Sequence, residues 1–267
     1  LETRDLASPG RLAPISINLK AGEVLGIAGL LGSGRSELLH GIFGADPAAT
    51  GEVILAGKRV KKTTTAAVEA GLALVPEDRF GQGLVRDFEI WRNATLPALG
   101  RVSFKNILLD NKREYQVALD RIQQLSIKAN SPNVLVSELS GGNAQKVTIA
   151  KWLFSDVKVF LLDEPTVGID VGTKAEILLL VRRLAEAGKA VIIVSSEFEE
   201  LLAVSHRIIV MRDGHQIAER LVHETVAQDH RHLGHLPAGL TGPSGSRANR
   251  SPESSPRPAE PDPRRCR

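Results

Sequence analysis

Residues 25–43 read LGIAGLLGSGRSELLHGIF, and the rest of the expected fold is arranged around them. The apolar residues 25–28 predict a buried strand, and residues 37–43 have the pattern of a helix. The glycine-rich segment between them matches the phosphate-loop pattern G-x-x-x-x-G-K-[ST], except that Arg35 stands at the lysine position before Ser36. Backbone N–H groups of such a loop converge on phosphate oxygens, and the helix N-terminus favours negative charge. We therefore expect residues 29–36, the phosphate loop, to bind the phosphates of a nucleotide.

A second motif, residues 159–164, is an apolar strand that ends in two carboxylates, Asp163 and Glu164. Asp163 could hold Mg²⁺ through water beside the Ser36 hydroxyl, since Mg²⁺ prefers oxygen ligands and keeps several waters. Glu164 could orient and deprotonate an attacking water. The alternative is a buried strand that ends in solvated acids, but the phosphate loop upstream favours a catalytic site.

A third motif, residues 139–146, reads LSGGNAQK and lies between the first two along the chain. Ser140 is a good N-cap for a following helix, and Gly141 and Gly142 would let another chain's phosphate approach the backbone closely. Alone, this segment could be an ordinary loop into a helix. Its position between the phosphate loop and the two carboxylates favours a phosphate contact.

Strand and helix patterns alternate on either side of a mainly helical block, residues 80–155. Alternation of this kind predicts a mainly parallel sheet covered by helices, with the helical block inserted into it. The expected strands are 25–28, 52–55, 59–60, 159–162, 190–194, 208–211 and 216–218, and the expected helices are 37–43, 111–127, 144–154, 174–187 and 197–203.

Composition limits the function further. The chain is 42% hydrophobic but has no apolar run approaching the roughly 18 residues of a membrane span. From His230 onward there are seven arginines against three acidic residues, whereas residues 1–229 carry 27 basic against 28 acidic residues. The basic excess therefore lies in the tail and does not indicate nucleic-acid binding. The tail, residues 229–267, is rich in Pro, Ser and Arg and is expected to be disordered, after a folded domain of residues 1–228. The chain does not begin with Met, which suggests part of a longer polypeptide.

The order of the three motifs resembles that of the ATP-binding cassette (ABC) ATPases, whose signature sequence residues 139–146 match. Residues 165–170 look like the segment that follows the catalytic glutamate in that family and ends in an aspartate. The resemblance implies an α/β P-loop ABC ATPase fold, with a mainly parallel core sheet, an N-terminal antiparallel β part and an inserted helical subdomain at about residues 80–155. The stretches most similar to importers of the ribose, xylose and galactoside type are residues 26–38, 75–79, 139–147, 163–174 and 191–197.

The resemblance also implies ATP and Mg²⁺ as cofactors, with Glu164 as the catalytic residue and Ser36, Asp163 and Glu77 at the metal. The residues expected to contact nucleotide, in this cassette or in a partner cassette, are Gly29, Leu30, Gly32, Ser33, Gly34, Arg35, Ser36, Glu37, Glu77, Ser140, Gly141, Gly142, Gln145, Asp170 and Ser196.

Four positions depart from the common cassette. Arg35 replaces a lysine, and a planar guanidinium is not a conservative exchange for a compact ammonium. Glu77 stands where the family usually has a glutamine, and Ser196 where a histidine normally contacts the γ-phosphate. Residues 7–14, where an aromatic ring would stack on adenine, contain no Phe, Tyr or Trp.

In the similar importers one polypeptide carries two fused cassettes, and Arg at this position is usual in the second. We therefore expect this chain to be the second cassette, with its partner cassette fused upstream. The expected further partners are transmembrane permease subunits and, indirectly, a periplasmic or extracellular sugar-binding protein, at the cytoplasmic face of the cell membrane. Each ATP would lie between one cassette's phosphate loop and the other's signature. The site completed by residues 140–145 would turn over, while the Arg35 site would bind ATP and hydrolyse it slowly or not at all.

Two other functions fit the same motifs. One is a regulatory or dimerisation module that holds ATP without useful hydrolysis. The other is a soluble ABC ATPase that acts on ribosomes or DNA, against which the near-neutral residues 1–229 and the lack of a long coiled-coil insertion count.

Overall fold

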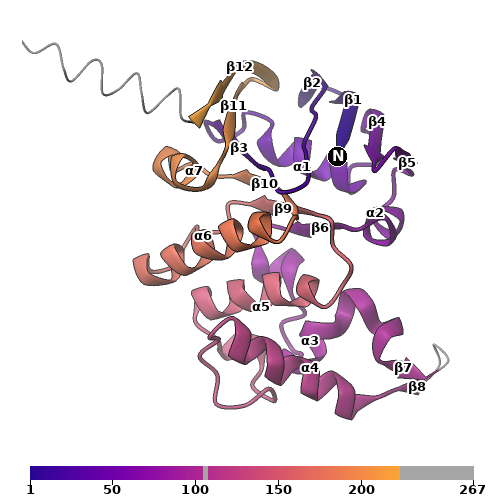
Figure 1. The fold of residues 1–267 in the computed structure, drawn as a ribbon, viewed down its shortest axis with the longest axis vertical. Helices are drawn as coiled ribbons and strands as arrows, with labels where there is room; N and C mark the ends of the chain where they lie inside the picture. Colours follow the sequence, from indigo (N-terminus) through magenta and orange to yellow (C-terminus); the bar gives the residue numbers. More distant parts are fainter. Residues whose placement is uncertain (105–107, 223–267) are drawn as a thin grey trace, which may run out of the picture.

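Residues 1–104 and 108–222 are described by the computed structural model, which has an upper part built on two β-sheets and a lower part of helices (Figure 1). The expected disordered tail lies outside these residues. The strands are β1 (Glu2–Ser8), β2 (Leu12–Ile15), β3 (Val24–Gly29), β4 (Thr50–Leu55), β5 (Lys58–Val60), β6 (Leu72–Val75), β7 (Ser103–Phe104), β8 (Leu108–Leu109), β9 (Val159–Asp163), β10 (Ala190–Val194), β11 (Arg207–Arg212) and β12 (His215–Leu221). The α-helices are α1 (Arg35–Phe43), α2 (Thr64–Ala70), α3 (Ile90–Thr95), α4 (Asn111–Gln124), α5 (Gly141–Leu153), α6 (Val171–Glu186) and α7 (Phe198–Val204), with shorter helical turns at Arg79–Gly83, Leu96–Val102 and Val136–Glu138.

The larger sheet has six strands in the order β12-β11-β3-β10-β9-β6, and all its pairs are parallel except β11 with β12. Every residue of β9 and β10 is buried, as expected for strands covered on both faces. A second sheet, in the order β2-β1-β4-β5, is antiparallel and comes from the N-terminal part of the chain. The mainly parallel core and the antiparallel β part are therefore confirmed.

Helix α1 lies between the two sheets. It contacts β1 of the antiparallel sheet and β3, β6 and β9 of the parallel sheet. A Cβ added at Gly41 of this helix would lie 3.4 Å from Leu6 of β1, so the two elements pack closely. One hydrophobic core accordingly runs through both sheets, and it fixes the helix that follows the phosphate loop.

The helical part is inserted between β6 and β9, which are neighbours in the parallel sheet. Helices α3, α4 and α5 form it (Figure 1), around a smaller hydrophobic core that includes Ile90, Ile127 and Val147. The insertion expected from the sequence is therefore confirmed, and it brings a core of its own.

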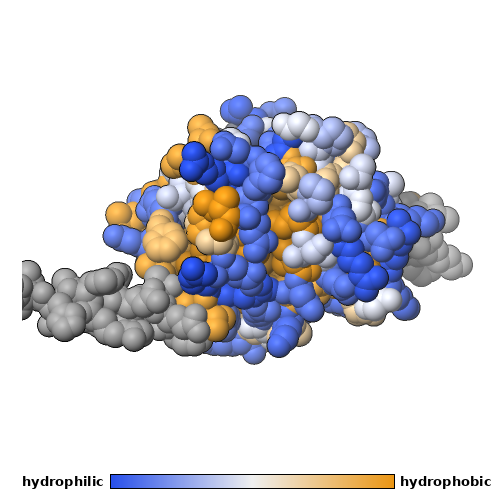
Figure 2. Space-filling model, turned by 90° about the horizontal axis from the view of Figure 1, so that it is seen from above, coloured by the Kyte–Doolittle hydropathy of each residue, from blue (hydrophilic) through white to orange (hydrophobic). Residues whose placement is uncertain are grey.

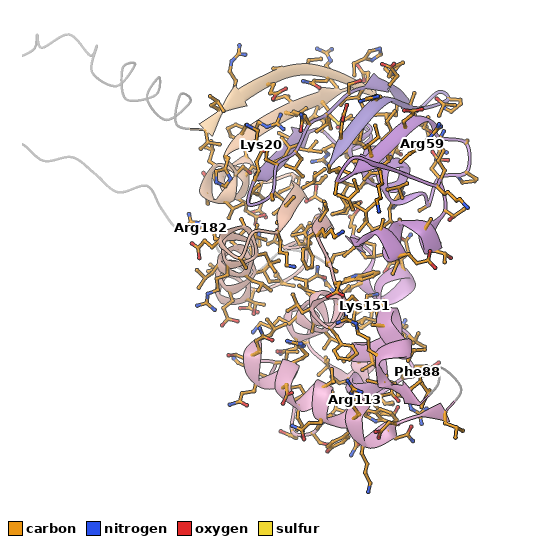
Figure 3. The ribbon with its side chains drawn as sticks, turned by 45° about the vertical axis from the view of Figure 1, so that its right-hand side comes forward. Lys20, Arg59, Phe88, Arg113, Lys151 and Arg182 are labelled. Carbon is orange, nitrogen blue, oxygen red and sulfur yellow. The ribbon has the colours of Figure 1, made fainter. Side chains whose placement is uncertain are left out.

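Two neighbouring residues of α5 make contacts with the preceding part of the chain, one of them to the sheet. The Trp152 indole N–H donates to the Leu74 carbonyl of β6 over 3.0 Å, and the indole meets the Phe43 ring edge-on at 6.2 Å. The Lys151 ammonium donates to the Gly83 carbonyl, and Figure 3 shows this residue where the two parts meet. Burial lowers the pKa of Lys151 to about 8.

Several element boundaries differ from those expected. Helix α4 ends at Gln124 rather than at residue 127, because Ser126 adopts a left-handed backbone (φ +49°). Helix α5 begins at Gly141 rather than at residue 144, since Ser140 caps it directly. The weak helix propensity of two adjacent glycines hid this first turn. The mainly helical block also contains the short β7–β8 hairpin, which the sequence pattern did not reveal.

No helix within residues 1–104 and 108–222 is both long and apolar enough to cross a membrane. On the face seen in Figure 2, hydrophobic side chains occur in separate groups between hydrophilic ones. This face therefore shows no continuous apolar band.

The Trp152 contact predicts a measurable loss of stability. In Trp152→Phe the buried Leu74 carbonyl loses its donor, so we expect the free energy of unfolding to fall by about 1–3 kcal/mol. Urea unfolding measures it. Trp91→Phe, at a partly exposed position of α3, is the matched control and should cost clearly less. Equal losses in the two variants would contradict the proposed role of the Trp152 hydrogen bond.

Candidate functional site

The phosphate loop turns sharply between β3 and α1. Its glycines Gly32 (φ +77°) and Gly34 (φ +94°) have left-handed backbones that other residues rarely adopt. At Gly34 a Cβ would also lie 3.0 Å from the Arg11 carbonyl oxygen. The Ser33 carbonyl accepts a hydrogen bond from the Gly214 N–H (3.0 Å), which ties the loop to the β11–β12 turn. The loop therefore has the tight backbone that the sequence predicted.

Parallel register brings the other two strand ends to the same edge of the sheet. Val194, the last residue of β10, lies opposite both Asp163 of β9 and Ile27 of β3. The chain therefore leaves β3, β9 and β10 side by side. The phosphate loop, Glu164 and Ser196 come together for this reason.

Ser36, Glu77 and Asp163, the three predicted metal-binding residues, line one pocket of about 370 Å³ with His40. The Asp163 side chain is buried, and its Oδ1 has no hydrogen-bond partner among the described residues. Burial raises the pKa of Asp163 to about 6, although a hydrogen bond from Ser36 opposes the rise. A buried carboxyl oxygen without a partner fits a cation that brings its own water and phosphate ligands.

The described residues contain no group of three His, Cys, Asp or Glu side chains that could enclose a metal by themselves. Mg²⁺ seldom needs such a cage, since it is usually held by one or two carboxylates together with substrate phosphates. Ser36 and Asp163 present one hydroxyl oxygen and one carboxylate, which suits a Mg²⁺ ion held in this way.

Arg35 and Glu164 form a buried ion pair, with Nη2 3.2 Å from Oε1 and side chains 6% and 7% exposed. The second carboxylate oxygen, Oε2, accepts the backbone N–H of Ser196 (3.0 Å) and its hydroxyl (3.2 Å). The residue expected to activate water is therefore held by the arginine of the phosphate loop. Sequence reasoning placed these residues in one site but did not foresee their pairing.

A second buried network, which sequence reasoning missed, supports the segment after Glu164. Glu200 of α7 accepts hydrogen bonds from the Thr166 hydroxyl (2.5 Å) and the Ser195 hydroxyl (2.8 Å). Lys174 of α6 lies 3.3 Å from the other Glu200 oxygen. These contacts join the loops after β9 and β10 to two helices. Nothing in the sequence around Thr166 or Glu200 signals this contact, because the two residues are 34 positions apart.

The remaining predicted residues of the phosphate loop lie close by. Leu30 is 83% exposed, and Glu37 is half-buried in the first turn of α1. A second pocket, of about 590 Å³, is lined by Gly29, Leu30, Gly32, Ser33 and Ser196 with apolar residues of β11, β12 and α7. The Ser33 hydroxyl is buried and has no partner among the described residues.

The signature segment, residues 139–146, lines neither pocket. Ser140 is exposed and caps α5, where its hydroxyl accepts from the backbone N–H of Asn143 (3.4 Å) and from the side-chain amide of the same residue (2.8 Å). Gly142 packs against α6, since a Cβ there would lie 2.6 Å from Thr173. Asp170 caps α6, and hydrogen bonds from Thr173 lower its pKa. This end of the molecule is thus separate from the phosphate loop.

Gln145 does not fit a surface contact in this structure. Its side chain is 1% exposed, and both of its polar atoms are buried without partners among the described residues. From Ala144 to Trp152 every residue of α5 is buried, and Gln145 lies within this stretch.

Arg79 contacts both the segment that follows Glu164 and the start of α5. The sequence did not reveal these contacts. Its guanidinium donates to the carbonyls of Val167 (3.0 Å) and Gly168 (3.4 Å). A Cβ on Gly141 would lie 3.0 Å from the same guanidinium. Arg79 therefore lies between the segment after Glu164 and the start of α5.

A family model described as ABC transporter matches residues 12–167. The chain is 46% identical over 215 residues to the arabinose import ATP-binding protein AraG of Azospirillum brasilense, covering 80% of this chain and 41% of that protein. It is 47% identical over 218 residues to the ribose import ATP-binding protein RbsA of Chromobacterium violaceum, covering 81% and 43%. The chain thus spans about two fifths of the length of these relatives.

Solved structures show the same fold. A dimeric ATP-binding cassette in a post-hydrolysis state bound to ADP and Pi superposes with a TM-score of 0.70 at 24% identity, covering 83% of this chain and 98% of that chain. A nucleotide-free ATP-binding cassette from an ABC transporter gives a TM-score of 0.71 at 21% identity, covering 87% and 96%.

The Glu200 network yields a second stability prediction. Thr166→Val keeps the shape of the side chain but removes a donor to a buried carboxylate, so unfolding should become easier by about 1.5–3 kcal/mol. Thermal and urea unfolding would measure the loss. Thr65→Val, on the exposed face of α2, is the control and should change stability little. If both variants unfold like the wild type, Thr166 does not support the site through Glu200.

Proposed function

Because the chain belongs to the ABC transporter family, we propose that it is the ATP-binding and ATP-hydrolysing cassette of a monosaccharide importer. The observation that carries the proposal is the meeting of the phosphate loop, Ser36 and Asp163 at one edge of the parallel sheet. The names of the relatives, which are arabinose and ribose import proteins, support a sugar as the cargo.

ATP and Mg²⁺ are the proposed cofactors. Backbone N–H groups of the phosphate loop and the start of α1 would hold the phosphates, and Ser36, Asp163 and Glu77 would hold Mg²⁺. Mg²⁺ held there would offset the negative charge of the phosphates. Glu164 would orient and deprotonate the attacking water wherever its carboxylate is released from Arg35. Support comes from the burial of Asp163 and from its unpartnered Oδ1.

We further propose that this is the second of two fused cassettes and that it works at the cytoplasmic face of the cell membrane. Its exposed Ser140 and half-buried Gly141 would complete the partner cassette's ATP site, with Asp170 near the same interface. Its own site, altered at Arg35, Glu77 and Ser196, would bind ATP and turn it over slowly. The partial coverage of the relatives is compatible with a further cassette beyond this chain.

The helical part offers a surface for the permease subunits. Arg92 lies over the rings of Trp91 (4.9 Å) and Phe88 (5.6 Å) in the region of residues 79–93, and Figure 3 shows Phe88 on this part of the molecule. Arginine and aromatic side chains are enriched at the centres of protein interfaces. A sugar-binding protein outside the membrane would complete the transporter.

One observation favours a second candidate function. Glu164 is fully engaged by Arg35 and Ser196, which suits a module that holds ATP to stabilise dimerisation without useful hydrolysis. Measuring ATP turnover and ATP-dependent dimerisation separately would distinguish the two functions.

Nucleotide binding is the first test. We expect the chain to bind ATP with a measurable dependence on Mg²⁺, and Ser36→Ala to weaken the Mg²⁺-dependent part by about tenfold, since a ligand oxygen is lost. Isothermal titration with and without Mg²⁺ would show this. Ser137→Ala, at an exposed position before the signature segment, is the matched control. Binding that is unaffected by Mg²⁺ or by Ser36→Ala would argue against the proposed metal site.

The asymmetry between the two sites can be tested in the full two-cassette protein. Ser140→Ala should reduce ATP turnover at least about tenfold by damaging the partner's site, whereas Glu164→Gln should reduce it less than about twofold. Thr63→Ala removes a comparable helix cap, that of α2, and should cost similar stability, about 1 kcal/mol, without loss of turnover. If Glu164→Gln abolishes activity as completely as the matching change in the first cassette, the two sites are not asymmetric.

A further inference from the structure

The ion pair between Arg35 and Glu164 leaves the expected catalytic base without a free oxygen. Oε1 faces the Arg35 Nη2 at 3.2 Å, and Oε2 accepts two hydrogen bonds from Ser196. These three contacts take up most of the acceptor sites of the carboxylate, so a water molecule can reach it only at Oε1, beside Arg35. The pair is buried on both sides, so solvent does not screen it.

Arg35 has one more nitrogen to offer. Its Nη1 is buried and has no hydrogen-bond partner among the described residues. A guanidinium presents its donors as a planar fork, so it can serve a carboxylate and a phosphate at the same time, in fixed directions. Ser33, in the same loop, also keeps a buried hydroxyl without a partner among the described residues. The phosphate loop therefore has two buried donors without partners, the Arg35 Nη1 and the Ser33 hydroxyl, beside the Arg35 Nη2 that contacts Glu164.

The backbone fixes both ends of the pair. Arg35 is the first residue of α1, directly after the left-handed Gly34. Glu164 has a left-handed backbone itself (φ +43°), which is uncommon for a residue other than glycine, and its N–H donates to the Val194 carbonyl (3.1 Å). The two side chains meet because the ends of β3 and β9 are held in place, one on either side of β10.

We propose that Arg35 bridges Glu164 and the terminal phosphate of a bound nucleoside triphosphate, so that the site retains the triphosphate while its base stays engaged. This inference rests on the proposed function, because it concerns the same nucleotide site. Arg35 cancels the charge of Glu164 that would otherwise repel the phosphate, and it crowds the one carboxylate oxygen that a water molecule could reach. Arg35 is thus a positioning residue that turns a hydrolytic site into a holding site.

A double-mutant cycle tests the bridge by binding alone. The four proteins are the wild-type chain, Arg35→Met, Glu164→Gln and the double variant, each titrated with a non-hydrolysable ATP analogue and with ADP in Mg²⁺. With Arg35 present, Glu164→Gln should change the affinity for the triphosphate less than about threefold, because the carboxylate is already neutralised. Arg35→Met should weaken triphosphate binding at least about tenfold.

Adding Glu164→Gln to Arg35→Met should recover at least about fivefold of the affinity for the triphosphate, since an unpaired buried charge is removed. ADP, which lacks the terminal phosphate, should respond little throughout.

A parallel cycle without nucleotide tests the pair itself. Arg35→Met leaves Glu164 buried without its counter-charge, so it should lower the melting temperature, and the double variant should melt higher than Arg35→Met alone. The exposed pair Arg59–Glu52, at 3.0 Å, provides the matched control, and its cycle should show little coupling in melting or in binding.

Two results would overturn the proposal. A double variant that melts no higher than Arg35→Met would mean that the pair does not form in solution. The second result concerns triphosphate binding. If Glu164→Gln tightens it as strongly in the wild-type chain as in Arg35→Met, Arg35 serves only one partner at a time. Failure of the proposed function looks different, because then neither the triphosphate nor ADP would bind to any of the four proteins.

Discussion

The parallel hydrogen-bonded register of β3, β10 and β9 is what the candidate site depends on. Val194 lies opposite Ile27 on one side and Asp163 on the other, so three chain segments leave the sheet at one edge. A shift by one residue would turn the carboxyl of Asp163 to the other face of the sheet. All five residues of β9 and of β10 are buried, so a slip would draw the carboxyl of Asp163 into the apolar sheet or push an apolar residue out at its edge.

Local sequence was sufficient wherever one segment determines its own structure. The phosphate loop was predicted because its glycines permit left-handed backbones that other residues rarely adopt, and the Ser140 cap because a serine before two glycines can satisfy a helix start. The strands that end in Asp163 and Val194 were found by their continuous apolar runs. Helix bounds were less certain, since Ser126 ends α4 through a left-handed backbone that its residue type does not announce.

Contacts between distant segments could not be predicted in the same way. Arg35 and Glu164 were both assigned to the nucleotide site, but their direct pairing depends on the backbone at Glu164 and on strand register. The Glu200 network and the Arg79 bridge to Val167 and Gly168 depend on how α7 and the segment after β6 pack against the sheet. The burial of Gln145 could not be predicted for the same reason, because only the packed helix shows that its side chain points inward.

The departures from the common cassette concern the nucleotide site. Residues 139–146, by contrast, keep the signature sequence. Ser140 caps α5 on the surface, and Arg79 and Thr173 pack against the two glycines beside it. At the phosphate loop, the arginine that departs from the common pattern is the residue that engages Glu164, and Ser196 engages the remaining oxygen. Two departures that looked like separate losses therefore act on a single carboxylate. A site that had merely decayed would have little reason to keep that carboxylate buried, with a partner on each oxygen, since an unused buried charge costs stability.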